Sequence, residues 1–313
     1  MADGSGIEWT DATWNPITGC SVVSPGCTNC YAMKLAGTRM KHHPSRAGLT
    51  VDSKAGPVWT GEVRFNEEWL DQPLRWQKPR LIFVCAHGDL FHESVPDEWI
   101  DRVFAVMALA PHHTFQVLTK RPERMRRYLG HGGTCIPVGI RHQAERIFGR
   151  DPGPLPIALP NVWLGVSAED QERADERIPL LLATPAAVRW VSAEPLLGGI
   201  NMQPWLDRLD WVVAGGESGP GARPMHPHWV QWLRDDCAKS GVAFSFKQWG
   251  DWFRFGERDV DGRVNTVSRG KHPLFWREMS GGEFMVRLPG GKKAAGRHLD
   301  GVIHNGYPEA RRV

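Results

Sequence analysis

Three cysteines near the start of the 313-residue chain have the spacing of a metal-binding loop. Cys20, Cys27 and Cys30 form a C-x6-C-x2-C pattern within residues 19–31, a segment that also contains turn-forming glycine and proline. In a reducing compartment, such a tight group is typical of a metal-binding or catalytic site rather than of a disulfide framework. The pattern therefore predicts that the three thiolates converge on one metal centre.

The number of cysteines indicates which centre fits. A structural zinc site needs four protein ligands, and an electron-transfer cubane has four cysteine ligands. Three cysteines leave one iron of a 4Fe-4S cluster open, and that iron can bind the amino and carboxylate groups of S-adenosylmethionine (SAM). An electron from the cluster then breaks the sulfonium bond and yields a 5′-deoxyadenosyl radical. The loop thus predicts a 4Fe-4S cluster with SAM as the second cofactor.

Two other centres fit the same loop. A zinc site would need a further ligand, for which the candidates are His42, His43 and Cys85. An electron-transfer cluster would need a fourth cysteine, drawn from Cys85, Cys135 and Cys237, which otherwise are small buried apolar residues. The alternative function is therefore a zinc- or cluster-containing protein that binds nucleic acid without radical chemistry.

Short apolar, β-branched runs recur along the chain and predict the strands that position these residues. Six runs are typical of parallel strands buried on both faces: 81–85, 115–118, 162–166, 188–191, 211–214 and 242–246. Apolar residues at helical spacing predict helices over 97–109 and 229–240, the second ending at Gly241. With one strand before Cys20 there are about seven, so an α/β fold with either an incomplete barrel or an open sheet fits.

Polar residues follow the strands at the same topological position in each unit. Asp89, Lys120, Glu169, Glu194, Glu217 and Lys247 each stand where a strand ends. In parallel α/β folds that edge carries the active site, although any one of them alone could be a helix cap or a surface charge. We expect catalytic roles for Lys120, Glu194 and Glu217. We expect cofactor-binding roles for Ser167, Glu169, Ser192, Glu194, Gly215, Gly216, Glu217 and Lys247.

Composition and charge indicate the cellular compartment and the class of substrate. The formal charge is +3, no apolar run approaches the roughly 20 residues of a membrane span, and no secretory signal is recognisable, so a cytoplasmic protein without membrane contact is expected. Five basic residues lie in 120–127 and three in 292–297, and the 15 Trp either stack on a flat ligand or pack under loops. These features favour a nucleic acid or nucleotide as substrate.

The remaining segments differ in composition from the strand–helix region. Residues 130–160 are rich in Gly, Pro and basic residues and are interpreted as a long insertion. Residues 251–313 are rich in Gly and charge and are interpreted as a small β or irregular appendage. The predicted domains are therefore a barrel over 1–250 and an appendage over 251–313.

Motifs along nearly the whole chain carry a family resemblance. They lie at 7–20, 89–92, 118–122, 215–219, 222–227, 246–250 and 295–301. The chain resembles the phage-type three-cysteine-motif proteins, a poorly characterised family that looks like a distant branch of the radical-SAM superfamily. The resemblance implies a partial (β/α) barrel with Cys20, Cys27 and Cys30 as cluster ligands, and an enzyme that cleaves SAM reductively to abstract hydrogen. Its expected partners are SAM, an unknown substrate, and a partner protein or electron donor. Gly215-Gly216-Glu217 resembles the SAM-amino-binding stretch of that superfamily but comes later in the barrel.

Overall fold

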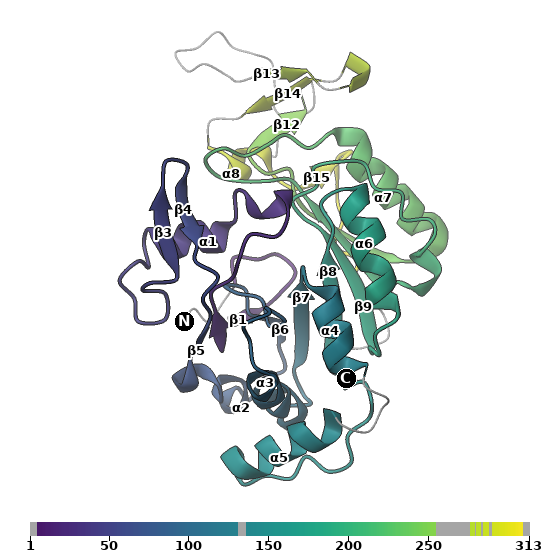
Figure 1. The fold of residues 1–313 in the computed structure, drawn as a ribbon. Coiled ribbons are helices and arrows are strands. Elements are labelled where there is room, and N and C mark those ends of the chain that lie inside the picture. The colour runs from purple at the N-terminus through teal and green to yellow at the C-terminus, as the bar shows by residue number, and fades with distance from the viewer. Residues whose placement is uncertain are drawn as a thin grey trace. The chain divides into compact units, whose positions relative to one another are not determined.

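A seven-stranded sheet is the centre of the computed structural model, which describes residues 5–130, 136–254, 276–278, 280–282, 284–287 and 290–308 (Figure 1). The sheet order is β1 (Ala12–Trp14), β6 (Leu81–Val84), β7 (Thr114–Thr119), β8 (Val162–Ser167), β9 (Val188–Ala193), β10 (Trp211–Gly215) and β11 (Ala243–Gln248). The strands therefore lie side by side in chain order, with no reversal of winding. This is the topology of a (β/α) barrel and not of a doubly wound sheet, and seven strands are one fewer than a closed barrel has. The predicted α/β fold is confirmed.

The chain packs as two compact units. The N-terminal unit comprises the described residues up to Val166 together with Arg177–Trp190. The C-terminal unit comprises Ser167–Glu176 and the described residues from Val191 to Pro308. The division of the chain at residue 250 stays a prediction.

One helix of the N-terminal unit matches a predicted range, and another lies in the segment interpreted as an insertion. Helix α3 (Asp97–Leu109) has the predicted bounds, and α5 (Ile136–Phe148) packs against it within the segment interpreted as an insertion (Figure 1). Glycine and proline interrupt the apolar pattern of α5. The glycine also explains the packing, because a Cβ on Gly139 would lie 2.6 Å from Oδ2 of Asp101 in α3. Helix α4 (Pro122–Leu129) is anchored to α3 through the Tyr128 hydroxyl, which donates to Asp101 Oδ1 at 2.5 Å.

Smaller elements of the N-terminal unit surround the start of the sheet. Strand β2 (Ile17–Thr18) pairs with β5 (Arg64–Phe65), and β3 (Thr50–Ser53) pairs with β4 (Gly56–Trp59). Helix α1 (Tyr31–Gly37) packs against the β3–β4 hairpin, and α2 (Gln72–Arg75) packs against α3 (Figure 1). The segment that carries the three cysteines lies between β2 and α1.

Tryptophans form much of the core. Trp9, Trp14, Trp249 and Trp252 are all buried, with at most 5% exposure. Trp190 is fully buried, and a Cβ on Gly165 would lie 2.4 Å from its ring. Of the two interpretations of the Trp excess, packing in the interior therefore holds for these residues, and stacking on a ligand does not.

The C-terminal unit contains helix α7 (Pro227–Ser240), which ends at Gly241 in the left-handed conformation (φ 68°), as predicted. Beyond the main sheet it adds an antiparallel sheet of β12 (Trp252–Arg254), β14 (Phe284–Arg287) and β13 (Trp276–Glu278). It also has helix α8 (Lys292–Ala295) and a pair formed by β15 (His298–Leu299) and β16 (Val302–Ile303). The expected β appendage is thus confirmed within the described residues.

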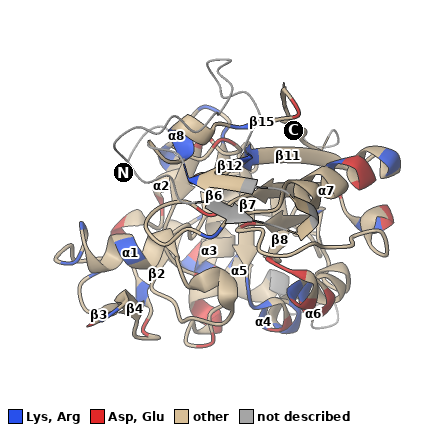
Figure 2. Cartoon of the chain, turned by 90° about the horizontal axis from the view of Figure 1, so that it is seen from above, with Lys and Arg blue, Asp and Glu red and all other residues tan. Residues whose placement is uncertain are grey.

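Charge is mixed on the helices. Figure 2 shows basic and acidic residues together on α7 and on α6 (Gln171–Leu182). None of the helices in the described ranges is long and apolar enough to cross a bilayer.

Candidate functional site

The cysteine loop begins at a backbone position that only glycine fits. Gly19 has φ +95°, and a Cβ there would lie 2.2 Å from the carbonyl oxygen of Glu62. Its N–H donates to the His87 carbonyl at 3.2 Å, and Gly19 forms a bridge with Gly88, past the end of β6. The chain is therefore fixed beside the β6 end immediately before Cys20.

The three cysteines lie on the segment between β2 and α1. Cys27 ends a short 3₁₀ turn (Pro25–Cys27), and Cys30 occupies the residue before α1. None of the three is in a disulfide, and the charge of Cys27 acts on both Cys20 and Cys30. Burial raises the pKa of Cys20 to about 12 and raises the pKa of Cys30, where the Met33 N–H opposes the shift. That the three thiolates bind one metal centre stays a prediction.

A buried arginine faces this loop from the end of β7. Arg121 is 5% exposed, and its Nη1 lies 3.5 Å from Cys20 Sγ. Its Nη2 donates to the Ser21 hydroxyl at 2.7 Å. On its other side, Nε donates to both carboxylate oxygens of Glu93, at 3.0 and 2.8 Å, and Nη1 donates to Asp89 Oδ2 at 3.0 Å. The guanidinium is therefore fixed between two carboxylates and the cysteine loop.

Asp89 joins the polar segments that follow β6 and β7. Its Oδ1 accepts from the Phe91 N–H at 3.0 Å and the Thr119 hydroxyl at 2.7 Å. Its Oδ2 accepts from the Lys120 N–H at 3.1 Å as well as from Arg121. Two motifs that are about thirty residues apart in sequence thus form one network, because adjacent parallel strands end at the same edge.

A histidine completes the contact with the loop. His92 is buried, and its Nδ1 accepts from the Ser94 N–H at 3.1 Å. In the neutral ring the other nitrogen, Nε2, must therefore carry the proton, which it donates to the Ser21 hydroxyl oxygen at 3.0 Å. Burial and Arg121 both lower the pKa of His92, which favours this neutral form.

Lys120 adds a second cation beside the cysteines. Its positive charge acts on Cys30 and lowers the pKa of that thiol against the effect of burial. In the part of the chain that the structure describes, the Lys120 ammonium has no hydrogen bond or ion pair; only its backbone N–H is engaged. It remains available to an anionic group.

Two cations lie beside the cysteine loop. Arg121 and Lys120 would offset part of the negative charge that three thiolates carry on binding a metal centre. Among the described residues, no three His, Cys, Asp or Glu side chains are grouped as ligands of a single metal ion. Of the other cysteines, Cys85 is buried after β6, Cys237 is buried in α7, and Cys135 lies outside the described residues.

The C-terminal unit collects carboxylates at the ends of its strands. Glu194 follows β9, and its Oε1 pairs with Lys247 Nζ at 3.1 Å. Both side chains are largely buried, with 13% and 19% exposure. Gly215, the last residue of β10, makes room for this carboxylate, because a Cβ there would lie 2.7 Å from Glu194 Oε1. Lys247 lies inside β11 rather than after it.

Glu217 is engaged by a neighbouring arginine. Its two carboxylate oxygens accept from Arg223 Nη2 at 2.6 Å and Nε at 2.9 Å, and one of them also accepts the Arg223 N–H at 2.9 Å. The preceding Gly216 allows two backbones to meet, since a Cβ would lie 1.9 Å from the Trp249 carbonyl oxygen. Glu169 is fully buried and its negative charge acts on Arg223. This role of Arg223 was not predicted, although the residue lies in the motif at 222–227.

The predicted residues thus fall into two groups, each within one unit. Cys20, Cys27, Cys30 and Lys120 lie together in the N-terminal unit. Ser167, Glu169, Ser192, Glu194, Gly215, Gly216, Glu217 and Lys247 belong to the C-terminal unit. Ser167 and Ser192 are buried within β8 and β9, near their carboxyl ends. That the two groups surround one mouth stays a prediction.

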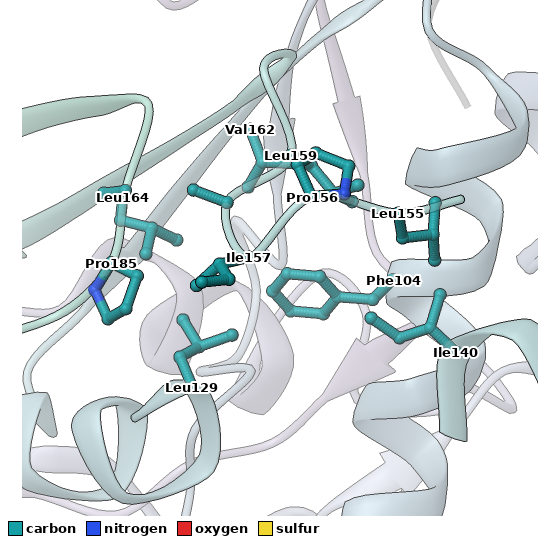
Figure 3. Close-up of a pocket in the computed structure, with 12 residues that line it drawn as sticks. Phe104, Leu129, Ile140, Leu155, Pro156, Ile157, Leu159, Val162, Leu164 and Pro185 are labelled. Carbon is teal, nitrogen blue, oxygen red and sulfur yellow. The ribbon is translucent and has the colours of Figure 1, made fainter. Parts of the chain in front are cut away.

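An apolar cavity lies elsewhere in the N-terminal unit. Its volume is about 20 Å³, and Phe104, Leu129 and Ile140 are among the side chains that point into it (Figure 3). None of the candidate site residues lines this cavity. It is a small gap between three helices, β8 and the segment 155–159 rather than part of the site.

Comparison with known proteins identifies the family. The family model described as "Protein of unknown function (DUF5131)" matches residues 4–308. The chain belongs to the DUF5131 family. The expectation of a family whose function is poorly known is thereby confirmed. A search of curated proteins gave no match. Among solved structures, a spore photoproduct lyase complexed with dinucleoside spore photoproduct aligns with 10% identity and a TM-score of 0.38, covering 92% of this chain and 71% of that chain.

The basic stretch at 120–127 of this DUF5131 protein is not a uniform cationic surface. Arg121 is buried in its ion pairs, so it is not free to contact a substrate as the sequence suggested. Arg124 pairs with Asp97, and Arg126 and Arg127 are exposed on α4. With the named tryptophans also buried, the preference for a nucleic acid rests on a smaller set of residues than the sequence indicated.

Proposed function

We propose that this DUF5131 protein is a radical-SAM-like iron–sulfur enzyme. In this proposal, Cys20, Cys27 and Cys30 hold a 4Fe-4S cluster whose fourth iron binds SAM, and the enzyme cleaves SAM reductively to abstract hydrogen from a substrate. The observation that carries the proposal is that three cysteines share one loop whose Cys20 and Cys30 thiols lie beside the cations of Arg121 and Lys120. When bound, the cluster supplies the electron and SAM supplies the hydrogen-abstracting group.

The residues of the loop have distinct tasks in this proposal. Arg121 and Lys120 offset the negative charge of three thiolates in a buried site, where an unbalanced charge is costly. Gly19 and the Asp89 network fix the loop before the cofactors bind. The free ammonium of Lys120 holds an anionic group of the substrate and is the proposed catalytic contact in this unit.

The strand-end carboxylates of the C-terminal unit are the proposed contacts for SAM. Glu194 accepts from the SAM amino group or ribose, and the ion pair with Lys247 orients that carboxylate. Glu217 is the second proposed acceptor, and it is positioned by its bidentate pair with Arg223. Ser167, Glu169, Ser192, Gly215 and Gly216 complete the proposed cofactor-binding set.

A nucleic acid or nucleotide is the proposed substrate class, and a separate donor protein is proposed to deliver the electron. Exposed Arg126 and Arg127 support phosphate contact, because guanidinium groups bind phosphate in a bidentate way.

SAM cleavage tests the proposal directly. The protein, purified and reconstituted without oxygen, is incubated with SAM and dithionite, and release of methionine and 5′-deoxyadenosine is measured. We expect release by the wild type and by Cys237→Ala, whose thiol is distant in the chain and buried in α7. Cys27→Ala should release neither product. Full iron content and full SAM cleavage in Cys27→Ala would contradict the assignment of Cys27 as a cluster ligand. Zinc in place of iron in the wild type would indicate a structural metal site instead.

A further inference from the structure

Arg121 has no free hydrogen-bonding capacity for a substrate, yet it is the charged side chain that reaches a cysteine sulfur. We propose that Arg121 is a positioning residue that sets the reduction potential of the centre on the cysteine loop. This inference rests on the proposed function and deepens it, because it names the residue that tunes the electron-transfer step.

The geometry fixes the guanidinium on the sulfur side of the loop. Nη1 is shared between Cys20 Sγ at 3.5 Å and Asp89 Oδ2 at 3.0 Å. Nη2 holds the next residue of the loop through the Ser21 hydroxyl at 2.7 Å. Nε is fully used by Glu93. A rotation of Arg121 away from Cys20 would break bonds to three residues, so its position does not depend on a bound cofactor.

The positive charge of Arg121 beside Cys20 should affect the reduction potential of the cluster. Reduction by one external electron makes a cluster with three thiolates more negative by one charge. A cation buried beside one of these thiolates stabilises the reduced state more than the oxidised state, and the effect is strong where the side chain is shielded from water. Asp89 and Glu93 act in the opposite direction. Asp89 is buried with Arg121, whereas the Glu93 side chain is 63% exposed and is therefore the easier of the two to change without loss of folding.

Two substitutions should consequently shift the potential in opposite directions. Arg121→Gln removes the cation and should lower the midpoint potential, with the reduction equilibrium falling roughly tenfold or more, about 59 mV for a one-electron couple. Glu93→Gln removes a carboxylate and leaves the guanidinium less compensated, so the potential should rise, by less than that. Arg121→Lys retains the charge and should lie closer to the wild type than Arg121→Gln does.

The measurement is an anaerobic dithionite titration of the reconstituted proteins, followed by EPR and by iron analysis. Arg124→Gln is the matched control, because Arg124 lies in the first turn of α4 and pairs with Asp97, whose side chain is 67% exposed. Its potential should equal that of the wild type. If Arg121→Gln fails to retain iron, the upward shift in Glu93→Gln still decides the question.

Equal potentials in the wild type, Arg121→Gln and Glu93→Gln, all with full iron content, would overturn the inference and leave the proposed function intact. A wild type that binds no iron would overturn the proposed function itself, and the inference with it.

Discussion

Two buried arginines of the N-terminal unit lie in different electrostatic settings. Arg121 is compensated by Asp89 and Glu93, and these partners raise its pKa against the effect of burial. Arg46 is 2% exposed, and no carboxylate among the described residues pairs with it. It donates instead to Ser45 and to Nδ1 of His87, and it lies 5.7 Å from the ring centroid of Trp69. Burial and nearby Arg64 lower the pKa of Arg46 to about 10.

His87 must be neutral to accept from Arg46, which predicts a pH effect on stability. Burial and Arg46 lower the pKa of His87 to about 4, whereas the unfolded value is about 6.5. Between these values the unfolded chain binds the proton and the folded protein does not, so stability is complete above about pH 6.5 and falls towards pH 4. The loss should reach up to about 3 kcal/mol.

Replacement of His87 separates this effect from other acid titrations. Urea unfolding of His87→Gln at several pH values should show a shallower loss of stability between pH 6.5 and 4 than the wild type. His42→Gln, at an exposed histidine, is the control and should follow the wild type. An unchanged slope in His87→Gln would mean that His87 is already protonated in the folded protein.

At the scale of elements, the apolar runs predicted six of the seven strands of the sheet, and the seventh, β1, matches the strand expected before Cys20. The strands are buried on both faces, so their sequences are continuous apolar runs that need no tertiary information to recognise. Helix α5 was missed for the opposite reason: its contact with α3 depends on a glycine, which weakens the local pattern. The close approach at Gly216 could not be read from sequence either, because its partner is a backbone carbonyl on the next strand's loop.

The close contact between Gly216 and the Trp249 backbone predicts that a larger residue at 216 destabilises the sheet. In Gly216→Ala the new Cβ would lie 1.9 Å from the Trp249 carbonyl oxygen, so β10 and β11 would have to separate at their carboxyl ends. The backbone bond from the Gly216 N–H to the Gln248 carbonyl, 2.8 Å long, would be strained or lost. We expect destabilisation of about 2–4 kcal/mol in denaturant unfolding.

Gly6→Ala is the matched control for this substitution. A Cβ on Gly6 has no heavy atom within 4 Å, and its φ is not in the left-handed region. Its stability should lie within about 0.5 kcal/mol of the wild type. Equal stabilities of the two variants would show that the β10–β11 ends tolerate separation, and that Gly216 is free to serve a ligand instead.

At the scale of the whole molecule, the sequence identified candidate residues but not the contacts among them. Residue type and spacing identified the three cysteines, and strand ends identified Glu194 and Lys247 as candidates. The pairing of Arg121 with Asp89 and Glu93 was not predicted, because it depends on which strands are neighbours. The same holds for the pairing of Arg223 with Glu217, which depends on how the chain turns after β10.

The most direct test of the central claim is EPR of the reduced, anaerobically purified protein with and without SAM, together with iron and sulfide analysis. The account predicts about four irons and four sulfides per chain, three cysteine ligands and one open iron. The signal of the reduced cluster should shift when SAM is added, because SAM binds the open iron. A protein that carries zinc, or a cluster whose signal is the same with and without SAM, would contradict the account.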